Sequence, residues 1–98
     1  MKDATLGGYL REHQRPPAFS GPDGNSYTVE ILTEHEEVEG GPWFAYLFFL
    51  RWRGNEPVGH VESRFLAGAR TEEEARAEVE RLGLHEVKTL LNSLVQST

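Results

Sequence analysis

The chain has 98 residues, of which 38% are apolar, and its formal net charge is −6. This length fits one compact domain spanning residues 1–98, and domains of this size bury about 60 to 65% of their unfolded surface. The net negative charge repels a phosphate backbone and disfavours nucleic-acid binding. Because cysteine is absent, disulfides, thiolate metal sites and cysteine nucleophiles are excluded.

The sequence shows no sign of membrane insertion or export. No run approaches the roughly 18 to 20 apolar residues that a membrane span requires. The first eight residues also lack the apolar core of a signal peptide. We therefore expect an acidic cytoplasmic protein that does not associate with membranes.

Residues 1–25 predict a short helix followed by an ordered loop. Asp3 or Thr5 can cap the helix. Its apolar side is formed by Leu6, Tyr9, Leu10 and His13. Gly7 and Gly8 each cost about 1 kcal/mol relative to alanine in a helix interior, so we expect the helix to form only by docking on the rest of the protein.

The loop after this helix is marked by prolines and glycines. Pro16 and Pro17 end the helix, because the residue before a proline is pushed out of the α region. Phe19 is the expected anchor of the loop, and the sequence Gly-Pro-Asp-Gly at residues 21–24 is typical of a turn.

Residues 26–67 predict a three-stranded antiparallel meander. Apolar and polar residues alternate from Ser26 to Glu37, which indicates a half-buried strand. Trp43 to Arg53 is the most apolar stretch, and we expect it to be the central strand. Its even positions form an unbroken apolar row of Phe44, Tyr46, Phe48, Leu50 and Trp52. Pro57 begins the third segment and suits an edge strand, because proline donates no backbone hydrogen bond.

Two tight turns give the expected strand registers. A two-residue turn at Gly40 and Gly41 places Ile31 opposite Leu50. A second turn at residues 54–55 places Val61 opposite Phe48. Both registers put the even row of the central strand on the buried face of the sheet.

Residues 71–96 predict two helices. Thr71 and Glu74 have the spacing of a capping box, and the acidic residues at 72–74 suit the positive end of the helix dipole. Gly83 separates the helices. The apolar positions are Ala75, Val79 and Leu82 in the first helix and Leu84, Val87, Leu90, Leu91, Leu94 and Val95 in the second. We expect both helices to cover the even face.

The predicted fold is therefore α+β, with an N-terminal short helix, a three-stranded antiparallel β-meander and two C-terminal helices packed on one face of the sheet. Its predicted core consists of Phe44, Tyr46, Phe48, Leu50, Val29, Ile31, Val61, Phe65, Val79, Leu82, Val87 and Leu91.

No stretch has the spacing of a known catalytic, metal or nucleotide site. His85 to Thr89 begins like the zinc-protease pattern HExxH but has threonine in place of the second histidine. We therefore expect no metal, no cofactor and no catalytic residues. An alternative is a small-ligand-binding domain or an enzyme that uses Glu34, His60, Glu62 and Arg64. Catalysis requires these groups to converge on a concave pocket, whereas docking does not, and we expect them to lie on a flat surface.

The odd face of the central strand is the predicted functional surface. Apolar residues with a charged rim are typical of a protein–protein interface. The predicted interface residues are Trp43, Leu47, Phe49, Leu32, Arg51, His60, Glu62 and Arg64. We expect a non-enzymatic interaction or regulatory module that forms a homodimer or binds one protein partner here. Alternatively, residues 1–25 fold over this face and make it a second small core.

The expected order of elements resembles two known architectures. The order helix, three antiparallel strands, helix resembles the double-stranded RNA-binding domain, whose RNA-binding members carry lysines where this chain has Glu72 to Glu74. Residues 27–82, with the sequence Gly-Ala-Arg-Thr-Glu-Glu-Glu-Ala at 68–75, are similar to HicB-type antitoxins, but a tight turn replaces the family's loop between strands two and three. This second resemblance implies a regulator as an alternative function.

Overall fold

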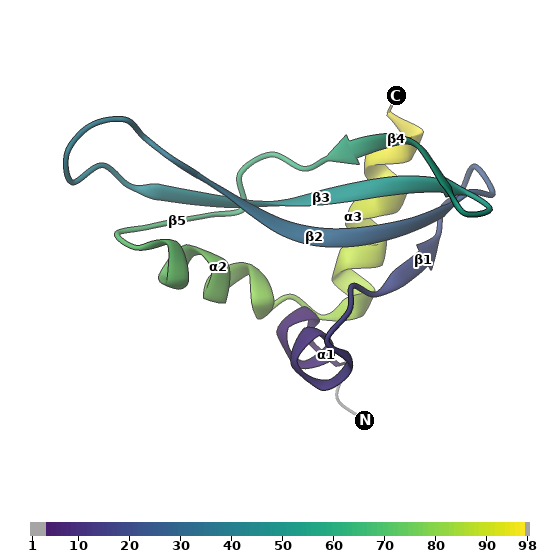
Figure 1. Ribbon diagram of the computed structural model, residues 1–98, viewed down its shortest axis with the longest axis horizontal. Helices are drawn as coiled ribbons and strands as arrows, with labels where there is room; N and C mark the ends of the chain where they lie inside the picture. The colour runs from purple at the N-terminus through teal and green to yellow at the C-terminus, as the bar shows by residue number, and fades with distance from the viewer. Residues whose placement is uncertain (1–3, 98) are drawn as a thin grey trace.

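In the computed structural model, which describes residues 4–97, the chain forms a five-stranded antiparallel sheet and three helices (Figure 1). The elements in chain order are α1 (Leu6–His13), β1 (Ala18–Ser20), β2 (Ser26–His35), β3 (Trp43–Arg53), β4 (Glu56–Glu62), β5 (Ala67–Ala69), α2 (Glu72–Glu80) and α3 (Leu84–Gln96). The strand order is β1-β2-β3-β4, and β5 also pairs with β3. The predicted α+β class is confirmed, but the sheet of the described residues has five strands rather than three.

Side-chain caps begin α1 and α2 where the sequence predicts them. The hydroxyl oxygen of Thr5 accepts a hydrogen bond from the Gly8 amide at 3.0 Å, and that of Thr71 accepts one from the Glu74 amide at 3.1 Å. The alternative cap, Asp3, lies outside the described residues. Within residues 4–97, no helix is long and apolar enough to cross a membrane.

The α1 helix docks closely on the connection between α2 and α3. Leu6 is fully buried, and its amide donates a hydrogen bond to the Leu82 carbonyl at 2.8 Å. A Cβ atom on Gly7 would lie 2.7 Å from the Cβ of Glu80. Gly7 therefore weakens the helix by itself but permits its close approach to α2, because any larger residue would collide there.

Two short strands are not predicted by the sequence pattern. The first, β1, lies in the predicted loop and places Phe19 opposite Tyr27 of β2. The second, β5, pairs with Trp43–Ala45 at the start of β3. Each has only three residues, which is too short for an alternating pattern to be recognised, so pairing with a longer neighbouring strand determines their conformation.

The predicted third strand ends early, as β4, and the chain pairs with β3 again only in β5. Between them, the Ser63 amide donates to the Leu47 carbonyl, and the Ser63 hydroxyl accepts from the Leu47 amide, each at 2.9 Å. The Leu66 amide donates to the Ala45 carbonyl at 2.8 Å. The chain therefore stays attached to β3 while the residues between the two strands leave the sheet geometry.

The register of β2 and β3 differs from the prediction and reverses which row of β3 is buried. Ile31 lies opposite Leu47 rather than Leu50. The connection is a wide loop at residues 36–42, closed by a hydrogen bond from the Glu36 amide to the Pro42 carbonyl at 3.2 Å, and not a two-residue turn. Because the register changes by an odd number of residues, every side chain of β3 exchanges faces relative to β2.

The register of β3 and β4 is as predicted at the turn and wrong beyond it. Trp52 lies opposite Pro57, as the turn at residues 54–55 requires. The pairing then skips Val58, and this bulge shifts the register by one residue, so that Val61 lies opposite Phe49 instead of Phe48. Because of this bulge, the buried side of β4 is the same side of the sheet as the buried odd row of β3.

The core lies between the odd face of β3 and the helices. The buried apolar residues are Leu6, Tyr27, Val29, Ile31, Ala45, Leu47, Phe49, Val61, Ala75, Val79, Val87 and Leu91. The helices thus contribute to one core with the odd residues of β3, and the expectation that they cover the even face is wrong. In Figure 1, the yellow α3 crosses behind the long strands.

The predicted core is half correct. Val29, Ile31, Val61, Val79, Val87 and Leu91 are buried as predicted. Phe44, Tyr46, Phe48, Leu50 and Leu82 are only half-buried, and Phe65 is 48% exposed. The errors on β3 have a single cause, which is the reversed register.

The reversed register predicts different costs for two adjacent phenylalanines. Phe49→Ala should lower the free energy of unfolding by about 3 to 5 kcal/mol, because it leaves a cavity in the closed core. Phe48→Ala, on the opposite face, should cost about 1 to 2 kcal/mol. Urea unfolding followed by circular dichroism measures both values, and equal costs would contradict this assignment of the faces.

Candidate functional site

The side of the sheet away from the core, here called the outer face, is the candidate functional site. Opposed residues of antiparallel strands share one side of the sheet. The outer face carries Thr28, Glu30, Leu32 and Glu34 from β2, Phe44, Tyr46, Phe48, Leu50 and Trp52 from β3, and His60 and Glu62 from β4. The buried residues of all three described helices belong to the core on the other side.

The apolar row of β3 on the outer face contacts its neighbours in the sheet. The Phe48 ring stacks on the His60 ring, with centroids 4.9 Å apart. The Trp52 indole nitrogen donates a hydrogen bond to the Thr28 hydroxyl at 2.9 Å. All five residues of the row are half-buried. A contiguous, partly exposed apolar surface of this kind is typical of a binding site.

The outer face is acidic. Glu30 and Glu62 lie on either side of Phe48, and Glu34 lies opposite Phe44. All three glutamates are exposed. The described strand residues on this face include no lysine and no arginine. The apolar row is therefore bordered by negative charge on both sides.

One end of the outer face is hollowed. The hollow has a volume of about 390 Å³ and is lined by Glu34, Tyr46, Glu62, Ser63, Arg64 and Phe65. It forms because β4 ends at Glu62, after which the chain carries Phe65 over the even row of β3. The Phe65 ring stacks on Phe44 with centroids 4.9 Å apart, and it is tilted by 57° against the Tyr46 ring with centroids 5.8 Å apart.

Two carboxylates act on the phenol of Tyr46 in this hollow. Its pKa is raised, first by partial burial and then by the negative charges of Glu34 and Glu62. Glu34 lies opposite Phe44 and Glu62 opposite Phe48, so the two glutamates are the diagonal neighbours of Tyr46. The hollow combines two aromatic rings with two carboxylates.

The eight residues predicted as an interface do not share one face. On the core side lie Trp43, Leu47, Phe49 and Arg51, of which Leu47 and Phe49 have no exposed surface. On the outer face lie Leu32, His60 and Glu62. Arg64 is exposed and lines the hollow. The sequence places Tyr46 and Phe48 in the core because both rows of β3 are apolar and nothing in them marks the buried side. It also places Phe65 in the core, because the break after Glu62 has no local sequence signal.

The four residues of the alternative ligand-binding or enzymatic site converge in part. Glu34, Glu62 and Arg64 line the hollow, where the sequence predicted a flat surface. His60 is not part of the lining and stacks on Phe48. Among residues 4–97, no group of three or more His, Asp or Glu side chains is arranged to hold a metal ion.

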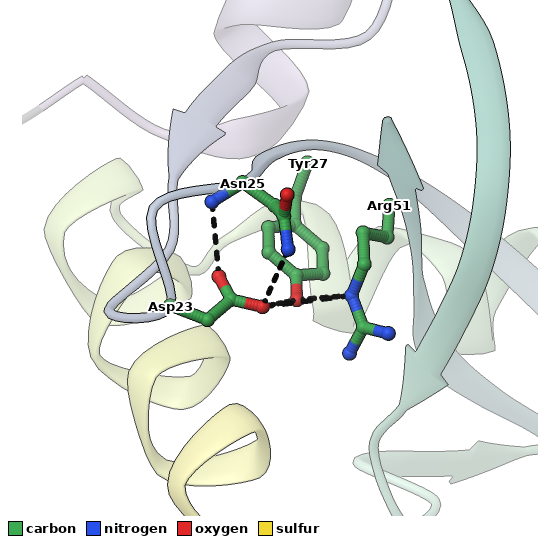
Figure 2. A network of polar contacts seen from close by, with 4 residues as sticks. All are labelled: Asp23, Asn25, Tyr27 and Arg51. Atoms are coloured by element: carbon green, nitrogen blue, oxygen red, sulfur yellow. Dashed lines mark hydrogen bonds and ion pairs between the residues drawn. The ribbon is translucent and has the colours of Figure 1, made fainter. Parts of the chain in front are cut away.

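Arg51 belongs to a structural network rather than to the outer face (Figure 2). The Tyr27 hydroxyl donates to Asp23 Oδ2, and Arg51 Nε donates to the Tyr27 hydroxyl, both at 2.7 Å. Arg51 Nε also lies 3.6 Å from Asp23 Oδ2. The amide and the side chain of Asn25 donate to the same carboxylate at 3.1 and 3.0 Å. These contacts hold the turn at residues 21–24 against β2 and β3.

The same network shifts the pKa of Asp23. The hydrogen bond from Tyr27 is the largest cause, and together with the bonds from Asn25 it lowers the pKa of the carboxyl from 3.8 to about 2. Burial and the hydrogen bond to Asp23 raise the pKa of the Tyr27 phenol. The ionised carboxylate is thus the form that the fold stabilises.

Comparisons of the chain with family models, with curated proteins and with solved structures found no match. The resemblances to RNA-binding domains and HicB-type antitoxins therefore remain expectations that are based on the order of the elements.

The Asp23 network predicts a loss of stability in acid. Because the pKa of Asp23 is lower in the folded state, its contribution to stability is present above about pH 4 and is lost as the pH falls towards about 2. Asp23→Asn should lower the free energy of unfolding at pH 7 and flatten its dependence on pH between about 4 and 2. Urea unfolding at a series of pH values measures this. The control is Glu37→Gln in the exposed β2–β3 loop, and an Asp23→Asn profile identical to that of the control would contradict the role of the network.

Proposed function

We propose that the protein is a non-enzymatic interaction module that binds a protein partner through the outer face. The half-buried apolar row on β3, on the side of the sheet away from the described helices, is the observation that supports this most. Burial of apolar surface contributes about 25 cal/mol per Å². Large aromatic side chains such as Phe48 and Trp52 are also among the residue types that anchor interfaces.

The charges of this face favour a partner with basic residues over a second copy of the chain. Two outer faces packed together would bring Glu30, Glu34 and Glu62 of one copy close to the same three residues of the other. Arg64 carries a single positive charge and cannot balance the three carboxylates. A partner segment that carries apolar residues flanked by lysine or arginine matches both the apolar row and its acidic border.

The hollow gives little support for catalysis. Among the residues that line the hollow, Ser63 carries the aliphatic hydroxyl group. That hydroxyl accepts from the Leu47 amide and donates to the Arg64 carbonyl at 2.7 Å, so it is engaged in holding the chain against β3. A serine nucleophile requires a neighbouring base to take its proton, and the lining contains no histidine. Binding is therefore the function that this arrangement favours.

A charge placed in the centre of the apolar row should separate binding from folding. Phe48→Glu should leave the protein folded, because Phe48 is outside the core, and should weaken capture of the partner from a native lysate by at least about tenfold. Val38→Glu is the matched control, since Val38 is 57% exposed in the β2–β3 loop. Affinity capture with quantitative mass spectrometry identifies proteins lost with the first variant only, and calorimetry with the purified partner then measures the affinity.

Two results would contradict this proposal. One is a partner that binds wild type and Phe48→Glu equally well. The other is a wild-type protein that is dimeric by light scattering and becomes monomeric with Phe48→Glu, because a second copy would then occupy the outer face. Binding to the purified partner should also weaken as salt is raised, since the matching charges lie at the exposed border of the interface.

A further inference from the structure

The hollow at the end of the outer face has the chemistry of a site for an organic cation. The rings of Tyr46 and Phe65 form two walls that meet at a 57° tilt. Glu34 and Glu62 line the same hollow, and both are exposed. The partial negative charge of an aromatic face and the full charge of a carboxylate attract the same kind of ligand.

We propose that this hollow binds one arginine or lysine side chain of the protein partner, with the cationic group lying against the Tyr46 and Phe65 rings and paired with the carboxylates of Glu34 and Glu62. The inference rests on the proposed function and identifies the part of the partner that this end of the outer face recognises. An anionic group would be repelled by the two carboxylates. A purely apolar group would leave both carboxylates without a partner as water is excluded from around them.

The raised pKa of the Tyr46 phenol supports this arrangement. Burial is the largest cause of the shift, and the charges of Glu34 and Glu62 both add to it, so both carboxylates lie close enough to act on the phenol. The volume of about 390 Å³ is sufficient for a guanidinium or an ammonium group with part of its aliphatic stem. A planar guanidinium can stack on a ring and donate hydrogen bonds to a carboxylate at the same time, which makes arginine the preferred ligand.

Arg64 is a positively charged side chain of the protein itself that competes with a ligand cation for the hollow. It is exposed and lines the hollow, yet it forms no ion pair with Glu34 or Glu62 among the described residues. Its positive charge repels an incoming cation and offsets part of the attraction of the carboxylates. Arg64→Ala should therefore strengthen cation binding by about two- to threefold.

A pair of small probes tests the charge requirement directly. N-acetyl-arginine methylamide carries the guanidinium, whereas the matching citrulline derivative has nearly the same shape and no charge. Each is titrated into the ¹⁵N-labelled protein and followed by two-dimensional NMR. The arginine probe should shift the amide signals of Glu34, Tyr46 and residues 62–65, and the citrulline probe should leave them in place.

Three variants locate the binding in the hollow. Glu34→Gln combined with Glu62→Gln should weaken binding of the arginine probe by about tenfold, because both favourable charges are lost. Phe65→Ala removes one aromatic wall at an exposed position and should weaken it several-fold. Glu30→Gln is the matched control, because it removes a carboxylate from the outer face that does not line the hollow, and it should change binding by less than about twofold.

The outcomes separate this inference from the proposed function. Equal shifts with arginine and citrulline, no shifts with either probe, or weakening by Glu30→Gln as large as that by the double variant would overturn the cation site. If these results appear while Phe48→Glu still abolishes partner capture, the outer face docks a partner that does not place a cation in the hollow. If the cation site is confirmed but Phe48→Glu has no effect, the docking proposal fails and the hollow binds a free cation.

Discussion

The pairing of β2 with β3 is the constraint on which the rest of the structure depends. Both rows of β3 are apolar, so its sequence allows either row to be buried, whereas β2 has one row suited to the core. Once Ile31 pairs with Leu47, the row containing Phe49 must face the helices. The row containing Phe48 is then left on the outer face, which is where the function is proposed to lie.

Two irregularities adapt the other strands to this register. The bulge at Val58 turns Val61 towards the same side as Phe49, so that β4 contributes to the core. At the break between β4 and β5, the amide and the hydroxyl of Ser63 both form hydrogen bonds with Leu47. The chain after Ser63 then places Phe65 over the outer row. Without that break the strand would run on along β3, and the hollow lined by Phe65 would not form.

The two faces of the sheet differ in how they satisfy their polar groups. On the core side, the hydroxyl of the buried Tyr27 is hydrogen-bonded to both Asp23 and Arg51, so a charged pair stabilises the fold. On the outer face, Glu34 and Glu62 lie exposed beside aromatic rings and form no ion pair among the described residues. The first arrangement is complete within the chain, whereas the second is complementary to a positively charged ligand.

The sequence alone determined the three described helices, the three longest strands and the burial of Val29, Ile31 and Val61. It did so because helix caps such as Thr71 and the alternation around Val29 and Ile31 are local signals. It could not determine which row of β3 is buried, because a strand with two apolar rows has no local signal for the buried side. The register of β3 against β2 depends instead on the shape of the loop at residues 36–42. Only the tertiary structure, through that loop and through the break after Glu62, brought Tyr46, Phe65 and the two glutamates into one hollow.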